Sequence, residues 1–231
     1  MIRSQRLKWD SEYFGFPCGR VNLEGTVSEA DLELHLASLK TMKLITLFNY
    51  DLDARNAELI AQLTRGALID VNLQMEKKLP GAHQKSVSAK ERFPGSEKLT
   101  ALADIAFPVS RFTADERLRE AGGSHIYREW VKNAYNQYGK YFVVLGDDEA
   151  FSLFHIDGDA LVLELCAVTP ERRGNGLGTL MWQVLEREAR HLGAHKIRVG
   201  TGLQNYRAVK FFHSMGCELV STAQVYHWWL S

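Results

Sequence analysis

A glycine-rich turn between a strand and a helix carries the clearest chemistry in this sequence. The apolar run that ends at Val168 leads into Pro170 and then into residues 173–178, Arg-Gly-Asn-Gly-Leu-Gly. Glycines remove side chains, so backbone N–H groups can point into one concavity. A helix beginning near Gly178 would add its partial positive charge, and Arg173 would add a full one. This combination predicts a pyrophosphate site.

Two common phosphate-binding motifs do not fit this turn. The Walker A loop ends in Gly-Lys-Ser/Thr, whereas residues 176–179 are Gly-Leu-Gly-Thr. The dinucleotide fingerprint Gly-x-Gly-x-x-Gly differs in spacing from Gly174-x-Gly176-x-Gly178, and no acidic residue follows where that motif requires one. The pattern that fits is Arg-x-x-Gly-x-Gly/Ala directly after a strand that ends in Val-x-Pro.

A second motif lies one predicted strand further along the chain. Residues 205–216 follow the pattern Asn-x-x-Ala-x-x-Phe-Phe-x-x-x-Gly. The first motif alone would leave an ordinary glycine-rich connection as an equal alternative. The two motifs together, with a helix and a strand between them, resemble the GNAT family of N-acetyltransferases over roughly residues 99–231. The resemblance implies that the turn binds the pyrophosphate of coenzyme A and that Asn205 contacts its pantetheine arm.

The resemblance also implies the fold and the way in which the cofactor, acetyl-CoA, would bind. We expect a GNAT fold of the α/β (or α+β) class, with a mixed central sheet, splayed fourth and fifth strands and a bulge in the fourth. The pantetheine arm would enter the gap, and a backbone N–H near Val168 would polarise the thioester carbonyl. The predicted cofactor-binding residues are Cys166, Ala167, Val168, Arg173, Gly174, Asn175, Gly176, Leu177, Gly178, Thr179, Asn205, Ala208, Phe211 and Phe212.

Attack of an amine on a thioester requires one proton to be removed and another to reach the departing thiolate. In some amino-sugar acetyltransferases of this family a glutamate at this place helps to deprotonate the amine, so the resemblance implies Glu164, four residues before Val168, as the base. A salt bridge on the strand is the alternative. Many family members carry a tyrosine four residues before the glycine that ends the second motif, but this chain has Phe212 there. Coenzyme A thiolate could also leave without an acid. The candidate acids in place of that tyrosine are Tyr206, Tyr226 and His213.

The whole chain resembles amino-sugar acetyltransferases of the TDP-fucosamine type, which act on a 4-amino group of a nucleotide-linked deoxysugar. The shared segments are residues 7–15, 110–112 and 127–134. A nucleotide-linked sugar brings a diphosphate, which Arg111, Arg128 or Lys132 could contact, and rings on which aromatic side chains could stack. Core packing is the alternative for those aromatic residues. The predicted substrate-binding residues are Arg111, Phe112 and Trp130.

Two other functions stay open at this point. The same turn would serve an acetyltransferase that modifies another small-molecule amine or a protein amine. The absent tyrosine also leaves room for an acyl-CoA-binding module without catalytic activity. In each case the expected partners are acetyl-CoA and, for an enzyme, a small-molecule amine acceptor, with a homodimer as an open alternative to a monomer.

Composition excludes several other classes of protein. The 231 residues are 45% hydrophobic and 24% charged, and 28 basic residues balance 28 acidic ones, so we expect no nucleic-acid partner. Three separated cysteines without a CxxC pair disfavour a disulfide framework or a metal site. We find no signal-like start and no apolar run of about 20 residues, and we expect no membrane association and a cytoplasmic location.

The elements that would position these motifs form two predicted units, without an internal repeat. Residues 1–80 form a smaller N-terminal α/β domain, 81–98 a polar linker and 99–231 the GNAT catalytic domain. A loop is expected at 110–112. Gly66 is expected to cap the C-terminal end of the helix predicted at 53–64. Predicted helices cover about 28–39, 53–64, 99–107, 124–136, 178–192 and 205–215. Predicted strands cover about 20–23, 44–48, 67–77, 141–145, 149–155, 160–168, 196–200 and 217–230.

Overall fold

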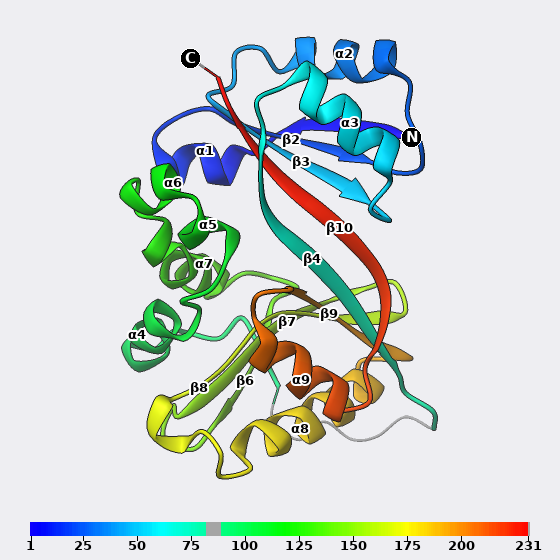
Figure 1. Ribbon diagram of the computed structural model, residues 1–231. Coiled ribbons are helices and arrows are strands. Elements are labelled where there is room, and N and C mark those ends of the chain that lie inside the picture. The colour runs from blue at the N-terminus through cyan, green and yellow to red at the C-terminus, as the bar shows by residue number, and fades with distance from the viewer. Residues whose placement is uncertain (82–88, 231) are drawn as a thin grey trace.

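The computed structural model describes residues 1–81 and 89–230, which form one mixed sheet with helices on both faces (Figure 1). The strands are β1 (Ile2–Arg6), β2 (Cys18–Leu23), β3 (Leu44–Tyr50), β4 (Ala67–Lys78), β5 (Lys90–Glu91), β6 (Tyr141–Leu145), β7 (Ala150–Asp157), β8 (Ala160–Val168), β9 (Lys196–Gly202) and β10 (Glu218–Trp229). The helices are α1 (Lys8–Phe14), α2 (Glu29–Ser38), α3 (Ala54–Leu63), α4 (Glu97–Ala106), α5 (Arg111–Ala114), α6 (Glu116–Glu120), α7 (Ile126–Ala134), α8 (Leu177–His191) and α9 (Tyr206–Ser214), with 3-10 turns η1 (Gly123–His125) and η2 (Pro170–Arg172).

The sheet is continuous through the whole molecule. Its strand order is β1-β2-β3-β10-β4-β9-β8-β7-β6-β5. The pairs β2–β3 and β8–β9 are parallel and the others are antiparallel. The long strands β4 and β10 lie side by side at its centre and run the length of the molecule in Figure 1. The expected mixed sheet of the GNAT fold is therefore present.

The topology contains a repeat that the sequence does not reveal. The unit β2-α2-β3-α3-β4 is followed later in the chain by the same arrangement, β8-α8-β9-α9-β10. Each copy places its last strand in the other copy's half of the sheet, since β10 lies next to β3 and β4 lies next to β9. The hydrogen-bonded sheet thus crosses the boundary expected between residues 80 and 99. The division into two domains stays a prediction, and residues 82–88 of the expected linker lie outside the described residues.

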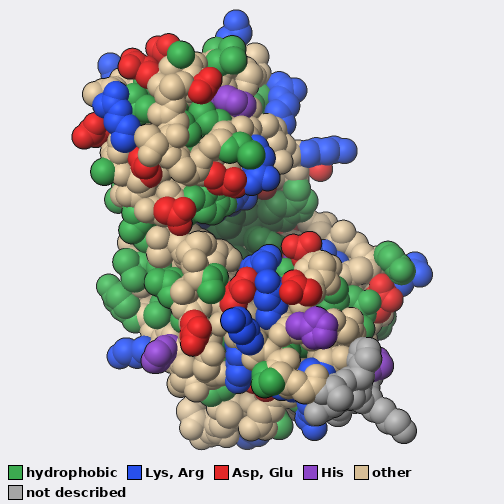
Figure 2. All heavy atoms as spheres, turned by 90° about the vertical axis from the view of Figure 1, so that its right-hand side faces the viewer, with side chains coloured by type: hydrophobic (Ala, Val, Ile, Leu, Met, Phe, Trp, Pro, Cys, Tyr) green, Lys and Arg blue, Asp and Glu red, His purple; other side chains and the backbone are tan. Residues whose placement is uncertain are grey.

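Helices cover the two faces of the sheet in different ways. On one face, α2 and α3 pack over β2 and β3, while α8 and α9 pack over β8 and β9. On the other face, α1 and α4–α7 form a second layer beside the middle of the sheet. Figure 2 shows a hollow between the two ends of the molecule, with hydrophobic side chains within it. In the described residues no helix is long and apolar enough to cross a bilayer.

The local signals that start helices act as expected. The Ser28 hydroxyl accepts a hydrogen bond from the Asp31 backbone N–H and begins α2, and Asp53 begins α3 in the same way. In α8, an apolar stripe that includes Trp182 and Leu185 turns toward the sheet and is almost fully buried. Burial of this stripe fixes the helix that follows the glycine-rich turn.

Two local predictions are wrong, each for an identifiable reason. Gly66 does not cap α3, because the chain leaves that helix in an extended conformation at Thr64 and enters β4 at once. Residues 110–112 are not all loop: α5 begins at Arg111, since the Ser110 and Thr113 side chains form a capping box. The sequence also gave no signal for β1, α1, β5 and α6.

Candidate functional site

The strand β8 contains a bulge at the residue predicted to be the base. Leu165 pairs with Leu153 of β7, whereas Leu163 pairs with Phe154, so Glu164 is the extra residue. A bulge of this kind redirects a side chain and interrupts the ladder. Here it directs the Glu164 carboxylate toward α7, where Trp130 donates to it.

Beyond the bulge, β8 separates from β9. The parallel pairing runs from Ala160 with Lys196 to Leu163 with Val199 and then stops, although both strands continue. Backbone groups of residues 164–168 that face β9 therefore have no partner in that strand. This gap between the two strands is the splay expected for the fourth and fifth strands of the GNAT fold, and we call it the strand gap.

The glycine-rich turn joins the end of β8 to the start of α8. Gly174 and Gly176 have φ angles of 78° and 81°, which glycine adopts freely, and a Cβ on either would meet no atom within 4 Å. No side chain caps α8, so the first backbone N–H groups of this helix remain available to an anion. Arg173 donates from Nε to the Val168 carbonyl oxygen at 3.1 Å and so holds the turn against the strand.

The second motif forms α9 next to this turn. The Asn205 side chain accepts from the Ala208 backbone N–H at 3.4 Å and caps the helix. Phe211 lies against Gly178, where an added Cβ would come within 3.4 Å of its ring, so the glycine permits close contact of α8 and α9. Phe212 is buried beside Trp182, with ring centroids 5.9 Å apart.

The tyrosines considered as acids lie far apart in the fold. Tyr206 is the first residue of α9 and is 66% exposed. Tyr226 is buried among the apolar side chains beneath α2 and α3, and burial raises the pKa of its hydroxyl. The buried position of Tyr226 gives no support to its role as an acid. The assignments of Tyr206 and Tyr226 as acids stay predictions.

A cavity of about 370 Å³ brings the predicted substrate-binding residues together with the predicted base. Its walls come from α1, α5 and α7, from β2 and from the bulge of β8. The residues that line it are Leu7, Trp9, Asp10, Arg20, Arg111, Phe112, Trp130, Asn133, Ala134, Gln137, Lys140 and Glu164. We call this space the acceptor cavity.

The Glu164 carboxylate is held by three donors. Lys140 Nζ and His155 Nδ1 contact Oε1, the latter at 2.6 Å, and Trp130 Nε1 donates to Oε2 at 2.9 Å. Burial alone would raise the pKa of Glu164, but the hydrogen bonds from His155, Lys140 and Trp130 hold it at about 2. Glu164 is therefore ionised and fully engaged at neutral pH.

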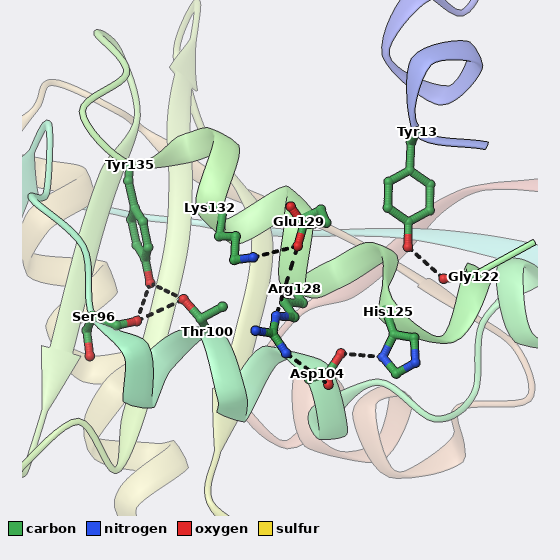
Figure 3. Close-up of polar contacts among 10 residues, drawn as sticks. All are labelled: Tyr13, Ser96, Thr100, Asp104, Gly122, His125, Arg128, Glu129, Lys132 and Tyr135. Carbon is green, nitrogen blue, oxygen red and sulfur yellow. Dashed lines mark hydrogen bonds and ion pairs between the residues drawn. The ribbon is translucent and has the colours of Figure 1, made fainter. Parts of the chain in front are cut away.

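Helix α7, which carries Trp130, is anchored by polar contacts to α4 and to the turn before it (Figure 3). The Tyr135 hydroxyl donates to the Ser96 carbonyl oxygen at 2.9 Å, and at the other end Asp104 contacts His125 at 2.8 Å. Contacts at both ends of the helix fix its orientation over the sheet. The Trp130 indole is thereby positioned above β8.

Helix α1 forms the opposite wall of the acceptor cavity. Trp9 faces Trp130 with ring centroids 6.0 Å apart, and the Tyr13 hydroxyl donates to the Gly122 carbonyl oxygen at 2.6 Å (Figure 3). This hydrogen bond joins α1 to the segment before α7. Aromatic rings from residues more than a hundred positions apart thus line one space.

The cationic side of the cavity is built by two arginines. Arg111 lies over the Phe112 ring at 4.0 Å and 3.9 Å from Asp10 Oδ2. Arg20 lies over the Phe48 ring at 3.8 Å and donates to the Asn22 side chain. Among the described residues no carboxylate lies within 4.0 Å of the Arg20 guanidinium, so its charge stays available to a ligand.

Sequence reasoning missed several members of this site. Trp9 and Asp10 lay in a segment noted for its resemblance alone, and nothing assigned them a role. Arg20, Lys140 and His155 carried no signal, because each stands alone in a strand or a loop and is brought to the cavity or to Glu164 by tertiary packing. Among the described residues no group of three His, Cys, Asp or Glu side chains is placed to hold a metal ion.

Comparison with known proteins places this geometry in a family. The model of the acetyltransferases of the GNAT family matches residues 101–217, half of the chain. The chain belongs to the GNAT acetyltransferase family. This match confirms the family and the enzyme class that the two motifs predicted.

Individual relatives of this GNAT protein are more distant. The spore coat polysaccharide biosynthesis protein SpsD of Bacillus subtilis (strain 168) is 26% identical over 142 residues, which are 59% of this chain and 48% of that protein. The chain thus spans about half the length of this curated relative.

Solved structures agree with the fold. A GNAT protein from Sphaerobacter thermophilus has a TM-score of 0.60 at 11% identity, and the match covers 98% of this chain and 76% of that one. A tandem GNAT protein from the clavulanic acid biosynthesis pathway has a TM-score of 0.59 at 12% identity, covering 92% and 75%. At such identities the likeness shows the fold alone.

The GNAT family uses acetyl-CoA, and the geometry of this chain fits it. The bare glycine turn and the uncapped start of α8 suit a pyrophosphate, and the strand gap offers unpaired backbone groups to the pantetheine amides. Cys166, Ala167 and Val168 lie along the strand gap. Asn175, Leu177 and Thr179 lie at the turn and the first turn of α8.

Proposed function

We propose that the chain transfers an acetyl group from acetyl-CoA to the primary amine of a nucleotide-linked sugar, with the 4-amino group of a deoxysugar as the expected position. The observation that carries this proposal is the acceptor cavity, which places two arginines and an aromatic wall beside the strand gap. Arginine is well suited to phosphate oxygens, and tryptophan faces to sugar rings. The relative SpsD, named for polysaccharide biosynthesis, adds support for a sugar acceptor.

The two ends of the acceptor cavity suit the two ends of such an acceptor. Arg20 and Arg111 supply positive charge on the side of the first unit, where a diphosphate would be attracted. Trp9 and Trp130 form the walls between that end and Glu164. The two indoles are in contact, so a sugar would stack on the surface that they line together and present its amine toward the strand gap. In this proposal residues 99–231 bind the cofactor, and both units of the chain contribute to the acceptor cavity.

The residues of this chain contribute mainly by positioning the reactants. When bound, acetyl-CoA supplies the acetyl group as a thioester. Unpaired backbone N–H groups of residues 164–168 can donate to the thioester carbonyl oxygen, which gains negative charge as the amine attacks, and one such donor is worth about 3 kcal/mol. Holding the amine beside the thioester carbon lowers the barrier further, because the entropy of encounter is lost on binding.

Thiol release from acetyl-CoA tests the proposal. Nucleotide-linked amino sugars, free amino sugars and lysine peptides should be compared at equal concentrations, and we expect turnover to be highest with the nucleotide-linked sugars. Turnover with lysine peptides but not with sugars would contradict the proposal. Binding of coenzyme A without turnover on any amine would instead favour a non-catalytic acyl-CoA-binding module.

A matched pair of variants tests the cavity itself. Arg20→Gln should raise KM for the nucleotide-linked sugar about tenfold or more, since a charge-assisted hydrogen bond is lost, and should leave KM for acetyl-CoA unchanged. Arg6→Gln changes an exposed arginine of β1 outside the acceptor cavity and should alter neither value. Equal kinetics for the two variants would exclude Arg20 from acceptor binding.

A further inference from the structure

Glu164 is poorly suited to accept the proton of the amine. Both of its oxygens already receive hydrogen bonds, from Lys140 and His155 on one side and from Trp130 on the other. Its pKa of about 2, which those donors maintain against the effect of burial, makes it a weak base. A general base works best when its pKa lies closer to the operating pH. The geometry of Glu164 is that of a positioning residue, and the site needs another base.

A second carboxylate reaches the strand gap from the first unit of the chain. Asp70 lies on β4, the strand that pairs with β9 on the side away from β8. Its carboxylate lies directly against Gly202: a Cβ built on that glycine would be 2.5 Å from Asp70 Oδ2 and 2.9 Å from Oδ1. Gly202 belongs to the end of β9 that has separated from β8. The carboxylate of Asp70 therefore lies against the end of β9 that borders the strand gap.

Gly200 has the same role for a neighbouring side chain. A Cβ there would be 2.6 Å from Gln74 Nε2, and Gln74 itself donates to the Asn72 side chain at 2.6 Å. Two glycines at alternate positions of β9 thus allow two polar side chains of β4 to lie across it. Such an arrangement gives Asp70 a defined place beside the strand gap.

One oxygen of Asp70 is engaged and the other is not. Oδ1 accepts from the Val71 backbone N–H at 2.8 Å, while Oδ2 accepts no hydrogen bond from any described residue. Burial raises the pKa of Asp70, and the Val71 N–H, Arg111 and His227 oppose that rise. Tyr127 of α7 also interacts electrostatically with Asp70. Arg111 also lines the acceptor cavity, so the charge of a cavity residue acts on Asp70.

We propose that Asp70 is the proton acceptor for the amine. As the amine nitrogen forms its bond to the thioester carbon, Asp70 Oδ2 takes the proton that this nitrogen loses. The carbon–sulfur bond then breaks, its electron pair leaves with the sulfur of coenzyme A, and the proton passes from Asp70 through solvent to that thiolate. Atoms and charge balance without a further reactant. The assignment rests on the proposed acetyltransferase function and refines it.

The variant Asp70→Asn tests this role, because it keeps the shape and the contact with the Val71 N–H. We expect kcat to fall about 100-fold or more, and KM for acetyl-CoA to stay within about twofold. The acidic limb of the pH profile of kcat should disappear. A purely structural role is tested by thermal unfolding: removing a partly buried carboxylate whose pKa is raised should not lower Tm. Asp157→Asn, an exposed carboxylate of β7, is the matched control and should leave kcat unchanged.

A second variant keeps Asp70 in the sequence but displaces its carboxylate. In Gly202→Ala the new methyl group would overlap Oδ2, so kcat should fall although the carboxylate remains. The double variant of Asp70→Asn and Gly202→Ala should have a kcat no lower than that of Asp70→Asn alone, because each change takes the same carboxylate away from the amine. This variant also carries the test if Asp70→Asn does not fold.

The outcomes separate this assignment from the proposed function. If the unchanged protein turns over and Asp70→Asn retains kcat within about threefold, the assignment is overturned and the acetyltransferase function stands. If the unchanged protein releases no thiol with any amine, the proposed function is overturned and the assignment with it. Loss of kcat together with a retained pH limb would also overturn the assignment, because the titrating group would then be another residue.

Discussion

The hydrogen-bonded carboxylate at the β8 bulge should stabilise the fold as well as the site. Glu164 is 7% exposed and receives hydrogen bonds from three side chains. Replacing it in Glu164→Gln removes the charge but keeps the size, and leaves the partly buried Lys140 ammonium without its partner. We expect the free energy of unfolding to fall because breaking one side of a buried pair is costly.

The magnitude follows from the pKa of Glu164. Folding lowers it from an ordinary value of 4.5 to about 2, and at about 1.4 kcal/mol per pH unit this corresponds to about 3 kcal/mol. The carboxylate is almost fully buried, so little of this is screened by solvent. For a chain of this length the loss corresponds to a fall in Tm of about 6–12 °C at neutral pH.

The dependence on pH gives the prediction a sign. Because the pKa is lowered on folding, the stabilisation is complete above pH 4.5 and is lost as the pH falls toward 2. The difference between the unchanged protein and Glu164→Gln should therefore be largest at pH 7 and smaller at pH 3. Urea unfolding followed by circular dichroism at several pH values measures it.

Two results would refute this reasoning. One is a difference of less than about 0.5 kcal/mol at pH 7, which is the size expected for an ordinary surface substitution. The other is a difference that does not change between pH 7 and pH 3. Glu58→Gln is the matched control: Glu58 forms an exposed ion pair with Arg55, and its loss should cost about 0.5 kcal/mol or less.

Three further predictions concern other parts of the molecule. Gly176→Val should weaken acetyl-CoA binding about tenfold or more in calorimetry, since a branched side chain would stand over the start of α8, whereas Gly158→Val, also at positive φ, should leave affinity unchanged; equal losses would show that backbone strain is the cause. Cys18 and Cys217 should resist a thiol reagent in the folded protein, because burial raises their pKa to about 12 and about 11, and labelling before unfolding, seen by mass spectrometry, would contradict this. Asp115→Ala should lower the free energy of unfolding, measured in urea, by about 3 kcal/mol, because the carboxylate accepts from two side chains of β10 and two backbone N–H groups of α6. Asp115→Asn keeps the helix cap and should lower this free energy less. A larger loss for Asp115→Asn than for Asp115→Ala would show that the cap does not contribute to stability.

The sequence predicted the second half of the fold best. The strand at 160–168 and the helix after the glycine-rich turn have strong apolar periodicity and clear ends, and the structure places both within one residue of the prediction. The first residues were harder, because the seven-residue helix α1 and the edge strand β1 are too short for a periodic signal. Local patterns describe single elements, and these two are fixed by packing and strand pairing.

The candidate site could be predicted only where the resemblance reached it. Arg111 and Trp130 came from segments shared with known enzymes, and Glu164 came from its place on the cofactor strand of the family; the structure brings all three to one cavity. The contact of His155 with Glu164 depends on the extra residue in β8, which no local pattern marks. Asp70 is more remote still, since its place beside Gly202 follows from the exchange of central strands. Strand pairing between distant segments is not encoded in hydrophobic periodicity.

The exchange of β4 and β10 also has a consequence for biosynthesis. In the first half of the sheet, β3 and β4 have no direct pairing, because β10 lies between them and hydrogen-bonds to both. During translation, residues 1–80 therefore have an incomplete sheet. About 140 further residues must be synthesised before β10, the strand that completes it, is made. At about 5–20 residues per second this interval lasts roughly 7–30 s. During that time the nascent chain exposes two unpaired strand edges, so emergence of β10 from the ribosome should be the step that commits both halves to the folded state together.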